Sequence, residues 1–357
     1  MKKKIALLPG DGIGPEVSAE AVKVLNAIAN RFNHQFVFEN GLIGAVAIDS
    51  CGEPFPEATE KLCRSSDAIL FGAVGHPRFD TDPTLKVRPE QGLLKMRKNL
   101  GLFANLRPVK SYPSLFSRSP LKPEFLKGVD LVIFRELTGG IYFGEKTQTK
   151  EKASDTCTYQ KDEISRIAHL AYETASRRER KLTLVDKANV LATSRLWREV
   201  VSEISLSYPE VSTSYLFVDN AAMQLILNPR KFDVILTENM FGDILSDEAS
   251  VLAGSLGLLP SASIGTGVSL YEPVHGSWPE AAGKNIANPI GAILSASMML
   301  EHAFSLHVES ALVNRAVEDA IQSGMVTKDI DPLSGFSTTA TGDFIASYIL
   351  HEAMQTV

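Results

Sequence analysis

Short apolar runs alternate with longer amphipathic runs along most of the chain. The short runs predict buried strands, and apolar positions at helical spacing predict helices. Predicted strands lie at residues 4–8, 36–39, 68–72, 130–135, 181–186, 214–218 and 233–237. Predicted helices lie at residues 15–31, from the strand ending at 186 through residue 204, and at 241–255. This alternation is typical of an α/β fold with parallel-rich sheets and crossover helices.

The length and the distribution of glycine and proline predict two domains. A chain of 357 residues is too long for one ordinary core and fits two domains of about 150–180 residues. Glycine and proline cluster near residues 101–108 and 254–260, as is typical of crossings between domains. We therefore expect one domain built from both chain ends, residues 1–102 plus 255–357, and a second domain at residues 103–254.

Charge and cysteine content exclude several classes of protein. A net charge of −6 provides no broad basic surface for nucleic acid, and no apolar run approaches the ~20 residues that span a bilayer. Too few apolar residues follow the N-terminal lysines for a secretion signal. Cys51, Cys63 and Cys157 are odd in number and form no C-x-x-C pair, which favours a reducing compartment. We expect a cytoplasmic protein that binds neither nucleic acid nor membrane.

Charged side chains that could bind a ligand or transfer a proton lie at or shortly after the ends of four predicted strands. These residues are Arg135, Lys187, Asp219 and Asp243. In open α/β sheets ligands bind beyond the carboxyl ends of the strands, so the four side chains are expected on one rim. Each one alone has the alternative interpretation of a solvated charge at a strand end.

Two carboxylates in the last of these segments suggest a metal site. Asp243 and Asp247 are four residues apart, hence on one face of a predicted helix, where they repel unless a cation lies between them. Oxygen-only ligands suit Mg²⁺ or Mn²⁺. The alternative is an acidic first helical turn favoured by the helix dipole, and Asp219 at a neighbouring strand end favours the metal.

Three arginines could bind an acidic substrate. Arg97, Arg107 and Arg135 supply guanidinium groups, which bind carboxylates through paired hydrogen bonds. A small dicarboxylic acid would need several such groups. Taken singly, each arginine could instead form a surface ion pair.

The N-terminal glycine cluster does not match a dinucleotide fingerprint. Gly10, Gly12 and Gly14 lack the G-x-G-x-x-G spacing, and Pro15 stands where the fingerprint has its third glycine. A second glycine-rich stretch at residues 264–289 offers backbone amides together with polar side chains. By composition alone this second stretch could also be a plain surface loop.

Six stretches of the sequence resemble one enzyme family. They are residues 10–16, 135–144, 186–190, 219–225, 241–247 and 270–289. Together they are similar to the metal-dependent decarboxylating dehydrogenases that oxidise isocitrate or 3-isopropylmalate, and the similarity runs nearly from end to end. The resemblance implies a two-domain isocitrate/isopropylmalate dehydrogenase-like α/β fold rather than a Rossmann fold. It assigns the cofactor to the domain built from both ends, and substrate, metal and dimer contacts to residues 103–254.

Residues 88–97 resemble the branch of the family that acts on 3-isopropylmalate. Isocitrate enzymes have a serine and an asparagine where this chain has Leu93 and Leu94. An isopropyl group gains about 0.8 kcal/mol per buried methylene, whereas an unpaired carboxylate against leucine loses hydration without return. The resemblance also implies that Val190 of a neighbouring subunit completes the pocket. Without the resemblance, the two leucines would be interpreted as an ordinary core pair.

The resemblance implies a role for each remaining site residue. Arg97, Arg107 and Arg135 would bind the two malate carboxylates, and Asp219, Asp243 and Asp247 would hold Mg²⁺ or Mn²⁺. Lys187 would be the base for the substrate hydroxyl, and Tyr142 would protonate the enolate left by decarboxylation. Lys187 and Asp219 would come from the second subunit of a homodimer, whose intersubunit arm corresponds to residues 138–159.

The cofactor implied by the resemblance is NAD. The residues that match the family's adenosine-side loop are Glu272, His275, Gly276, Ser277, Glu280 and Asn288. An acidic group at 280 would accept hydrogen bonds from ribose and repel a 2′-phosphate, which favours NAD over NADP. Trp278 stands where a small residue is usual, and Glu280 where aspartate is usual.

These features together predict oxidative decarboxylation of 3-isopropylmalate to 4-methyl-2-oxopentanoate and CO₂, through 2-isopropyl-3-oxosuccinate, in leucine biosynthesis. One rival is a phosphatase with Asp219 as its nucleophile, but Ala221 stands where that chemistry needs a second acid. Another rival is a regulatory subunit without turnover. Such subunits usually lose a metal carboxylate or the base, whereas this sequence keeps them.

Overall fold

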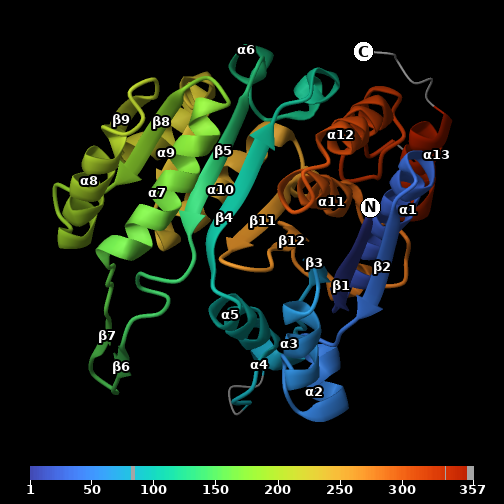
Figure 1. Cartoon of the computed structure of the whole chain (residues 1–357), viewed down its shortest axis with the longest axis horizontal. Coiled ribbons are helices and arrows are strands. Elements are labelled where there is room, and N and C mark those ends of the chain that lie inside the picture. Colours follow the sequence, from blue (N-terminus) through green and yellow to red (C-terminus); the bar gives the residue numbers. More distant parts are fainter. Residues whose placement is uncertain (82–84, 334, 352–357) are drawn as a thin grey trace. The chain divides into compact units, whose positions relative to one another are not determined.

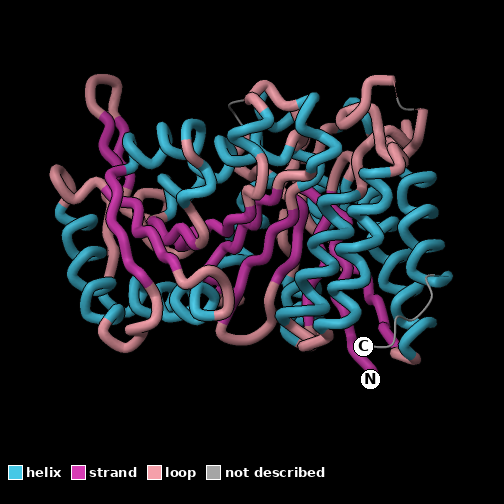
Figure 2. The backbone as a smooth tube through the Cα atoms, turned by 90° about the horizontal axis from the view of Figure 1, so that it is seen from above, coloured by secondary structure: helices cyan, strands magenta, loops and turns pink. Residues whose placement is uncertain are grey.

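The computed structural model describes residues 1–81, 85–333 and 335–351, and they form two compact units. One unit contains Met1–Leu100 together with the segment from Ser255, and the other is Gly101–Gly254. Helices lie along the strands of each unit (Figures 1 and 2). The expected α/β fold with mostly parallel strands is therefore confirmed. The functional assignment of the two domains stays a prediction.

The unit built from both chain ends has five strands in the order β2-β1-β3-β12-β11. Strand β1 is parallel to β2 and β3, β12 is parallel to β3, and β11 is antiparallel to β12. The strands are β1 (Lys2–Gly10), β2 (Gln35–Asn40), β3 (Ala68–Ala73), β11 (Pro260–Gly265) and β12 (Leu270–Pro273). The helices are α1 (Gly14–Phe32), α2 (Ala45–Cys51), α3 (Glu57–Arg64), α4 (Arg78–Thr81), α5 (Pro89–Asn99), η3 (Leu256–Leu258), η4 (Pro279–Ala281), α11 (Ile290–His302), α12 (His307–Gln322) and α13 (Thr338–His351). Helix α1 packs against α11 and α13, so the first and last helices share one core.

The middle unit has five main strands in the order β4-β5-β10-β8-β9. Strand β4 is antiparallel to β5, and the remaining neighbours are parallel. The strands are β4 (Leu102–Lys110), β5 (Asp130–Glu136), β8 (Lys181–Asp186), β9 (Ser212–Phe217) and β10 (Val234–Thr237), with a separate hairpin of β6 (Lys146–Gln148) and β7 (Ala153–Asp155). The helices are η1 (Pro113–Arg118), α6 (Pro123–Leu126), α7 (Lys161–Ser176), α8 (Ala192–Ser205), α9 (Val218–Leu227), η2 (Pro229–Lys231) and α10 (Asn239–Ala253).

Every predicted strand has a counterpart whose ends lie within two residues of the prediction, and the shifts at β9 and α10 have local causes. The predicted strand at 214–218 is β9, which ends at Phe217 because Val218 already begins α9. The predicted helix at 241–255 is α10, which begins at Asn239, where the Glu238 side chain accepts a hydrogen bond from the N–H of Phe241. Helix α10 stops at Gly254 because glycine adopts the left-handed conformation there, with φ of 96°. Both helix ends are thus set by capping residues.

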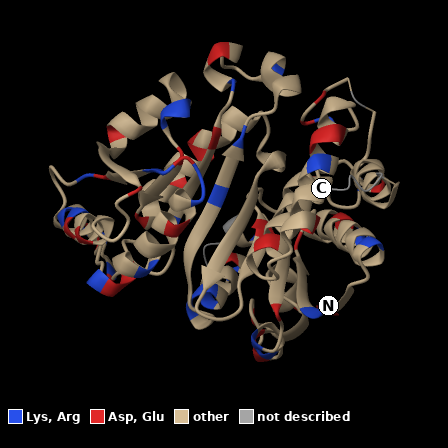
Figure 3. Ribbon diagram, turned by 45° about the horizontal axis from the view of Figure 1, so that its top comes forward, with Lys and Arg blue, Asp and Glu red and all other residues tan. Residues whose placement is uncertain are grey.

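Charged residues of both signs are interspersed over the elements of both units (Figure 3). No helix in the described part of the chain is long and apolar enough to cross a lipid bilayer.

The N-terminal glycines allow backbone segments of the first unit to approach closely. Gly10 and Gly12 have φ of 70° and 59°. A Cβ at Gly10 would lie 2.0 Å from the carbonyl oxygen of Ala73, and one at Gly12 would lie 1.9 Å from that of Ser277. The absence of a Cβ at these glycines therefore lets the segment after β1 pack closely against the end of β3 and against the loop that contains Ser277.

Asp11, between these glycines, connects the same segments through its carboxylate. The side chain is buried, and it accepts hydrogen bonds from the N–H groups of Ala45, Val46 and Gly75 at 2.8, 3.0 and 2.9 Å. Ala45 and Val46 begin α2, so the carboxylate also caps that helix.

We expect Asp11→Ala to lower the free energy of unfolding by at least about 3 kcal/mol, because two buried N–H donors and one part-buried donor lose their acceptor. Urea unfolding followed by circular dichroism measures this change. The control is Glu57→Ala, which removes an exposed carboxylate paired with Lys61 and should leave the unfolding midpoint unchanged. Equal stability of the two variants would contradict the role given to Asp11.

Candidate functional site

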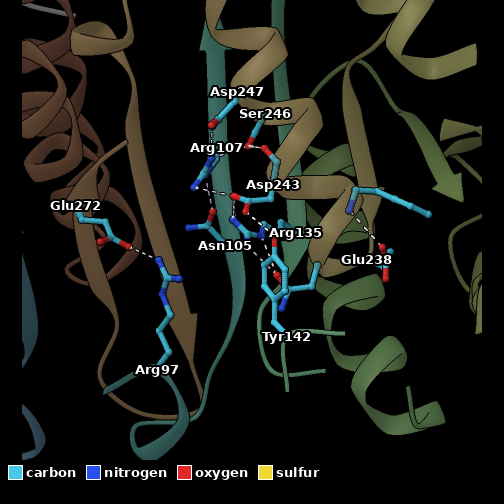
Figure 4. Close-up of polar contacts among 12 residues, drawn as sticks. Arg97, Asn105, Arg107, Arg135, Tyr142, Glu238, Asp243, Ser246, Asp247 and Glu272 are labelled. Atoms are coloured by element: carbon cyan, nitrogen blue, oxygen red, sulfur yellow. Dashed lines mark hydrogen bonds and ion pairs between the residues drawn. The ribbon is translucent and has the colours of Figure 1, made fainter. Parts of the chain in front are cut away.

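Arginines and aspartates gather where β4, β5 and α10 meet in the middle unit (Figure 4). Strands β4 and β5 are neighbours, and Asn105 on β4 lies opposite Arg135 on β5. Helix α10 packs on both strands and carries Asp243 and Asp247 one turn apart. Three elements therefore bring the predicted Arg107, Arg135, Asp243 and Asp247 together.

Arg107 lies between the two carboxylates of α10. Its Nη1 donates to Asp247 Oδ1 at 3.0 Å and to Ser246 Oγ at 2.7 Å. Its Nη2 is 3.9 Å from Asp243 Oδ1, and its Nε donates to Asn105 Oδ1 at 2.8 Å. Asn105 and Ser246 thus hold the guanidinium group between the acids.

Arg135 is almost fully buried and contacts the same helix. Its Nη1 donates to Asp243, while Nε and Nη2 donate to Asn239 Oδ1 at 3.0 and 2.9 Å. The hydroxyl of Tyr142 donates to the other oxygen of Asp243 at 2.9 Å. Burial, together with this bond to Asp243, raises the pKa of the Tyr142 phenol above its ordinary value. The phenol therefore stays protonated near neutral pH.

The pair Asp243 and Asp247 has the chemistry of a divalent-cation site. Both carboxylates project from one face of α10, and a cation, the guanidinium of Arg107, already lies between them. Within the described residues no three His, Cys, Asp or Glu side chains are grouped to hold a metal ion, so Asp219 does not join this pair within one chain. Hard oxygen donors with room for water and substrate oxygens fit Mg²⁺ or Mn²⁺.

Lys187 and Asp219 form a second group in the middle unit. Lys187 follows β8 and Asp219 begins α9 after β9, and the two strands are parallel neighbours. The ammonium of Lys187 donates to Asp219, which holds the pKa of that carboxyl below its usual range. Asp219 is 65% exposed in its side chain, and Val190, in the turn after Lys187, is 63% exposed. This group faces outward from its own chain.

The remaining predicted substrate residues lie in the unit built from both chain ends. Arg97 on α5 donates through Nη2 to Glu272 Oε1 on β12 at 3.0 Å, and both side chains are nearly buried. Leu94 on α5 is 42% exposed and Leu93 is half-buried. The two leucines are therefore not an ordinary core pair.

The predicted cofactor loop carries a buried nitrogen without a partner. Nδ1 of His275 contacts the carbonyl oxygen of Gly276 at 3.0 Å, whereas Nε2 is buried and has no partner. Burial lowers the pKa of His275, which favours the neutral ring. Because Nδ1 must donate to the carbonyl oxygen of Gly276, Nε2 of the neutral ring can accept one further hydrogen bond.

Other residues of this loop are either held by hydrogen bonds or exposed to solvent. Asn288 donates to Asp329 at 3.0 Å, and the carbonyl oxygen of Ser277 accepts from the N–H of Ile13 at 2.8 Å. Gly276 and Glu280 are exposed. Trp278 is 50% exposed and has φ of 36°, a left-handed backbone conformation that residues other than glycine rarely adopt. An orphaned polar atom beside open backbone is consistent with a ligand-binding loop.

Sequence reasoning missed three residues that hold the arginines in place, namely Asn105, Asn239 and Ser246. Their neutral side chains gave no signal of charge or spacing. One signal was available for Asn239, because it lies two residues after the end of β10, in the region beyond a strand end that identified the four charged residues.

Comparison with known proteins identifies the family. Residues 4–345 match the model of the isocitrate/isopropylmalate dehydrogenase family. The chain is 53% identical to a 3-isopropylmalate dehydrogenase from Bacteroides fragilis over 98% of this chain and 99% of that protein. It is 58% identical to a protein of the same name from Geobacillus kaustophilus over 93% of this chain and 91% of that protein.

Solved structures agree in fold. The crystal structure of isocitrate dehydrogenase from Methylococcus capsulatus has a TM-score of 0.86 and 35% identity, covering 98% of this chain and 99% of that one. A beta-decarboxylating dehydrogenase from Thermococcus kodakarensis has a TM-score of 0.81 and 38% identity, covering 97% and 96%. This chain belongs to the isocitrate/isopropylmalate dehydrogenase family.

Proposed function

We propose that this chain catalyses the NAD-dependent oxidative decarboxylation of 3-isopropylmalate to 4-methyl-2-oxopentanoate and CO₂, a step of leucine biosynthesis. The observation that carries the proposal is identity of 53–60% to proteins named 3-isopropylmalate dehydrogenase over most of the chain. The cluster of Arg107, Arg135, Asp243 and Asp247 supports it, because it supplies groups for an acidic substrate and a metal ion. A cytoplasmic location stays a prediction.

The charges of this cluster support joint binding of metal and substrate. Two guanidinium groups and two carboxylates balance one another in the structure. A divalent cation adds two positive charges, and a malate dianion adds two negative ones. Binding both together keeps the cluster neutral and frees the guanidinium groups to turn from the aspartates to the substrate. Arg97 would contribute the third guanidinium group.

We assign the preference for a substrate with an apolar side group to helix α5. Leu94 is exposed and Leu93 half-buried on this helix, so both can contact a ligand. Their side chains suit an isopropyl group and oppose the extra carboxylate of isocitrate. Val190 of a partner chain would close the same pocket.

The chain's own residues supply the proton transfers. A divalent cation, when bound, supplies Lewis-acid stabilisation of negative charge on the substrate oxygens. NAD, when bound, supplies the hydride acceptor. Lys187, as the free amine, accepts the proton of the substrate hydroxyl, and Tyr142, which holds its proton, donates it to the enolate carbon after CO₂ has left 2-isopropyl-3-oxosuccinate. Arg107 and Arg135 hold the two carboxylates until one of them leaves as CO₂.

The cofactor is assigned to the loop that carries Glu272, His275, Gly276, Ser277, Glu280 and Asn288. The unpartnered Nε2 of His275 can bond to the adenine or the ribose of a dinucleotide. Glu280 is exposed, and its carboxylate opposes a 2′-phosphate, so NAD is preferred over NADP.

A homodimer with shared sites accounts for the exposed groups of the middle unit. Helices α9 and α10 pack together and expose large apolar side chains. Met223 and Leu227 on α9 are 56% and 58% exposed, and Ile244 on α10 is 59% exposed. A second copy seated on this face would bury these side chains. It would also bring the outward-facing Lys187 and Asp219 to the carboxylate pair of its partner.

The specificity constant should be highest for 3-isopropylmalate among 3-isopropylmalate, isocitrate, homoisocitrate and tartrate, measured as NAD reduction at 340 nm. Leu94→Ala removes three side-chain carbon atoms and with them about 2 kcal/mol of apolar contact with the substrate. It should therefore lower kcat/KM on 3-isopropylmalate roughly 30-fold. Leu206→Ala, which truncates an 83% exposed leucine, should leave it unchanged. A higher constant on another acid would refute the substrate assignment.

Removal of divalent ions should abolish turnover, and Mg²⁺ or Mn²⁺ should restore it saturably. In Asp247→Asn the metal concentration for half-maximal rate should rise on the order of tenfold, because one anionic ligand is lost. Glu199→Gln removes an exposed carboxylate of α8 and should match the wild type. Undiminished activity in thoroughly demetallated protein would overturn the metal assignment.

Shared sites predict complementation between inactive variants. Lys187→Ala and Asp243→Ala should each be inactive, but a mixed dimer carries one site with both changes and one with neither. Random mixing should therefore restore about one quarter of wild-type activity. Lys187→Ala mixed with Asp219→Ala should restore none, since both residues serve the same site. No recovery in the first mixture, with mixed dimers verified by mass spectrometry, would place Lys187 and Asp243 in one chain's site.

A further inference from the structure

Asn239 connects Arg135 to the base of the 138–159 segment. It is the first residue of α10, two residues after the end of β10, and is 1% exposed. Its Oδ1 accepts two hydrogen bonds from Arg135, from Nε at 3.0 Å and from Nη2 at 2.9 Å. Two N–H groups of one edge of the guanidinium group that converge on a single oxygen restrict its rotation more than one bond does.

The other polar atoms of Asn239 reach the two ends of the 138–159 segment. Its Nδ2 donates to the carbonyl oxygen of Gly139 at 3.3 Å, and its backbone N–H donates to the hydroxyl of Tyr159 at 2.9 Å. A Cβ at Gly140 would lie 2.2 Å from that hydroxyl, so Tyr159 packs directly on the start of the segment. Asn239 therefore contacts both Arg135 and the start of the segment that carries Tyr142. These contacts fix the position of that segment relative to Arg135.

The amide is neutral in a place where the neighbouring residues are acids. Glu136, which follows Arg135, and Glu238, which precedes Asn239, are both buried. Burial raises the pKa of each of these carboxyl groups. A third carboxylate at position 239 would bind the same two N–H groups but would also offset the charge of Arg135. The amide orients the guanidinium group and leaves its charge for Asp243 and for a ligand.

We propose that Asn239 is a positioning residue for substrate binding, which fixes the plane of the Arg135 guanidinium group without neutralising it. The carboxylate that Arg135 receives is that of 3-isopropylmalate, so this part of the inference rests on the proposed function. Loss of the amide frees the guanidinium group, which already contacts Asp243, to turn away from the substrate carboxylate. The backbone N–H of residue 239 still donates to Tyr159, so the segment that carries Tyr142 keeps that contact.

The test is a double-mutant cycle between positions 239 and 135. Asn239→Ala should raise KM for 3-isopropylmalate about tenfold, with kcat changed less than about threefold and KM for NAD unchanged. In an Arg135→Lys background the same change should add less than about twofold, because an ammonium group has no plane to orient. Equal factors in both backgrounds, or a loss confined to kcat, would overturn the proposal.

Asn239→Asp separates orientation from charge and keeps the shape of the side chain if the alanine variant folds poorly. It should raise KM for 3-isopropylmalate by a similar factor, since its carboxylate offsets the guanidinium charge. Asn26→Ala and Asn26→Asp, at an exposed position of α1, are the matched controls and should behave as wild type. Wild-type KM in Asn239→Asp would refute the importance of neutrality.

A crystal structure of Asn239→Ala provides a readout that does not depend on the substrate. The Arg135 guanidinium group should be rotated from its plane in the wild type, and an unchanged orientation would overturn the positioning role. If the wild type oxidised none of the hydroxy acids, the proposed function would fail, whereas a rotated Arg135 would still support the role of Asn239.

Discussion

Repulsion between Asp243 and Asp247 is the constraint on which the organisation of the middle unit's site depends. Two carboxylates one turn apart on a helix destabilise it unless positive charge lies between them. The chain meets this requirement with guanidinium groups from two adjacent strands, Arg107 on β4 and Arg135 on β5. The antiparallel pairing of β4 with β5 and the packing of α10 on both strands are the features that bring these groups together.

The groups that hold the arginines matter as much as the arginines themselves. Asn105, Asn239 and Ser246 accept hydrogen bonds from the guanidinium groups and carry no charge. The neutral acceptors fix the orientation of the guanidinium groups, while the aspartates attract their positive charge. Under the proposed function, a metal and an acidic ligand would replace the internal ion pairs without rearrangement of the strands, because the neutral partners stay and only the ionic ones change.

Sequence patterns predicted the fold class and several site residues, for identifiable reasons. Parallel strands follow from apolar runs separated by helices, and the rule for strand ends identified Arg135, Lys187, Asp219 and Asp243. The pattern failed for β4, β6, β7, β11 and β12. Strands β4 and β11 begin in the two stretches that were interpreted as domain crossings, and β6, β7 and β12 have only three or four residues. Neutral positioning residues were missed because uncharged side chains within a helix or strand have no distinctive spacing. The dimer and the roles of the cofactor loop depend on partners that one chain does not contain, so they stay predictions.

The unit assembled from both chain ends also constrains the order of folding during synthesis. Residues 101–254 are contiguous, so this unit can close its core as soon as it has left the ribosome. Helix α1 must wait for α11 and α13, and the turn at Gly12 must wait for Ser277, which is translated much later. Until then the apolar face of α1 lacks its final neighbours. The N-terminal third of the nascent chain is therefore made first but completes its core last, when the C-terminal helices have been made.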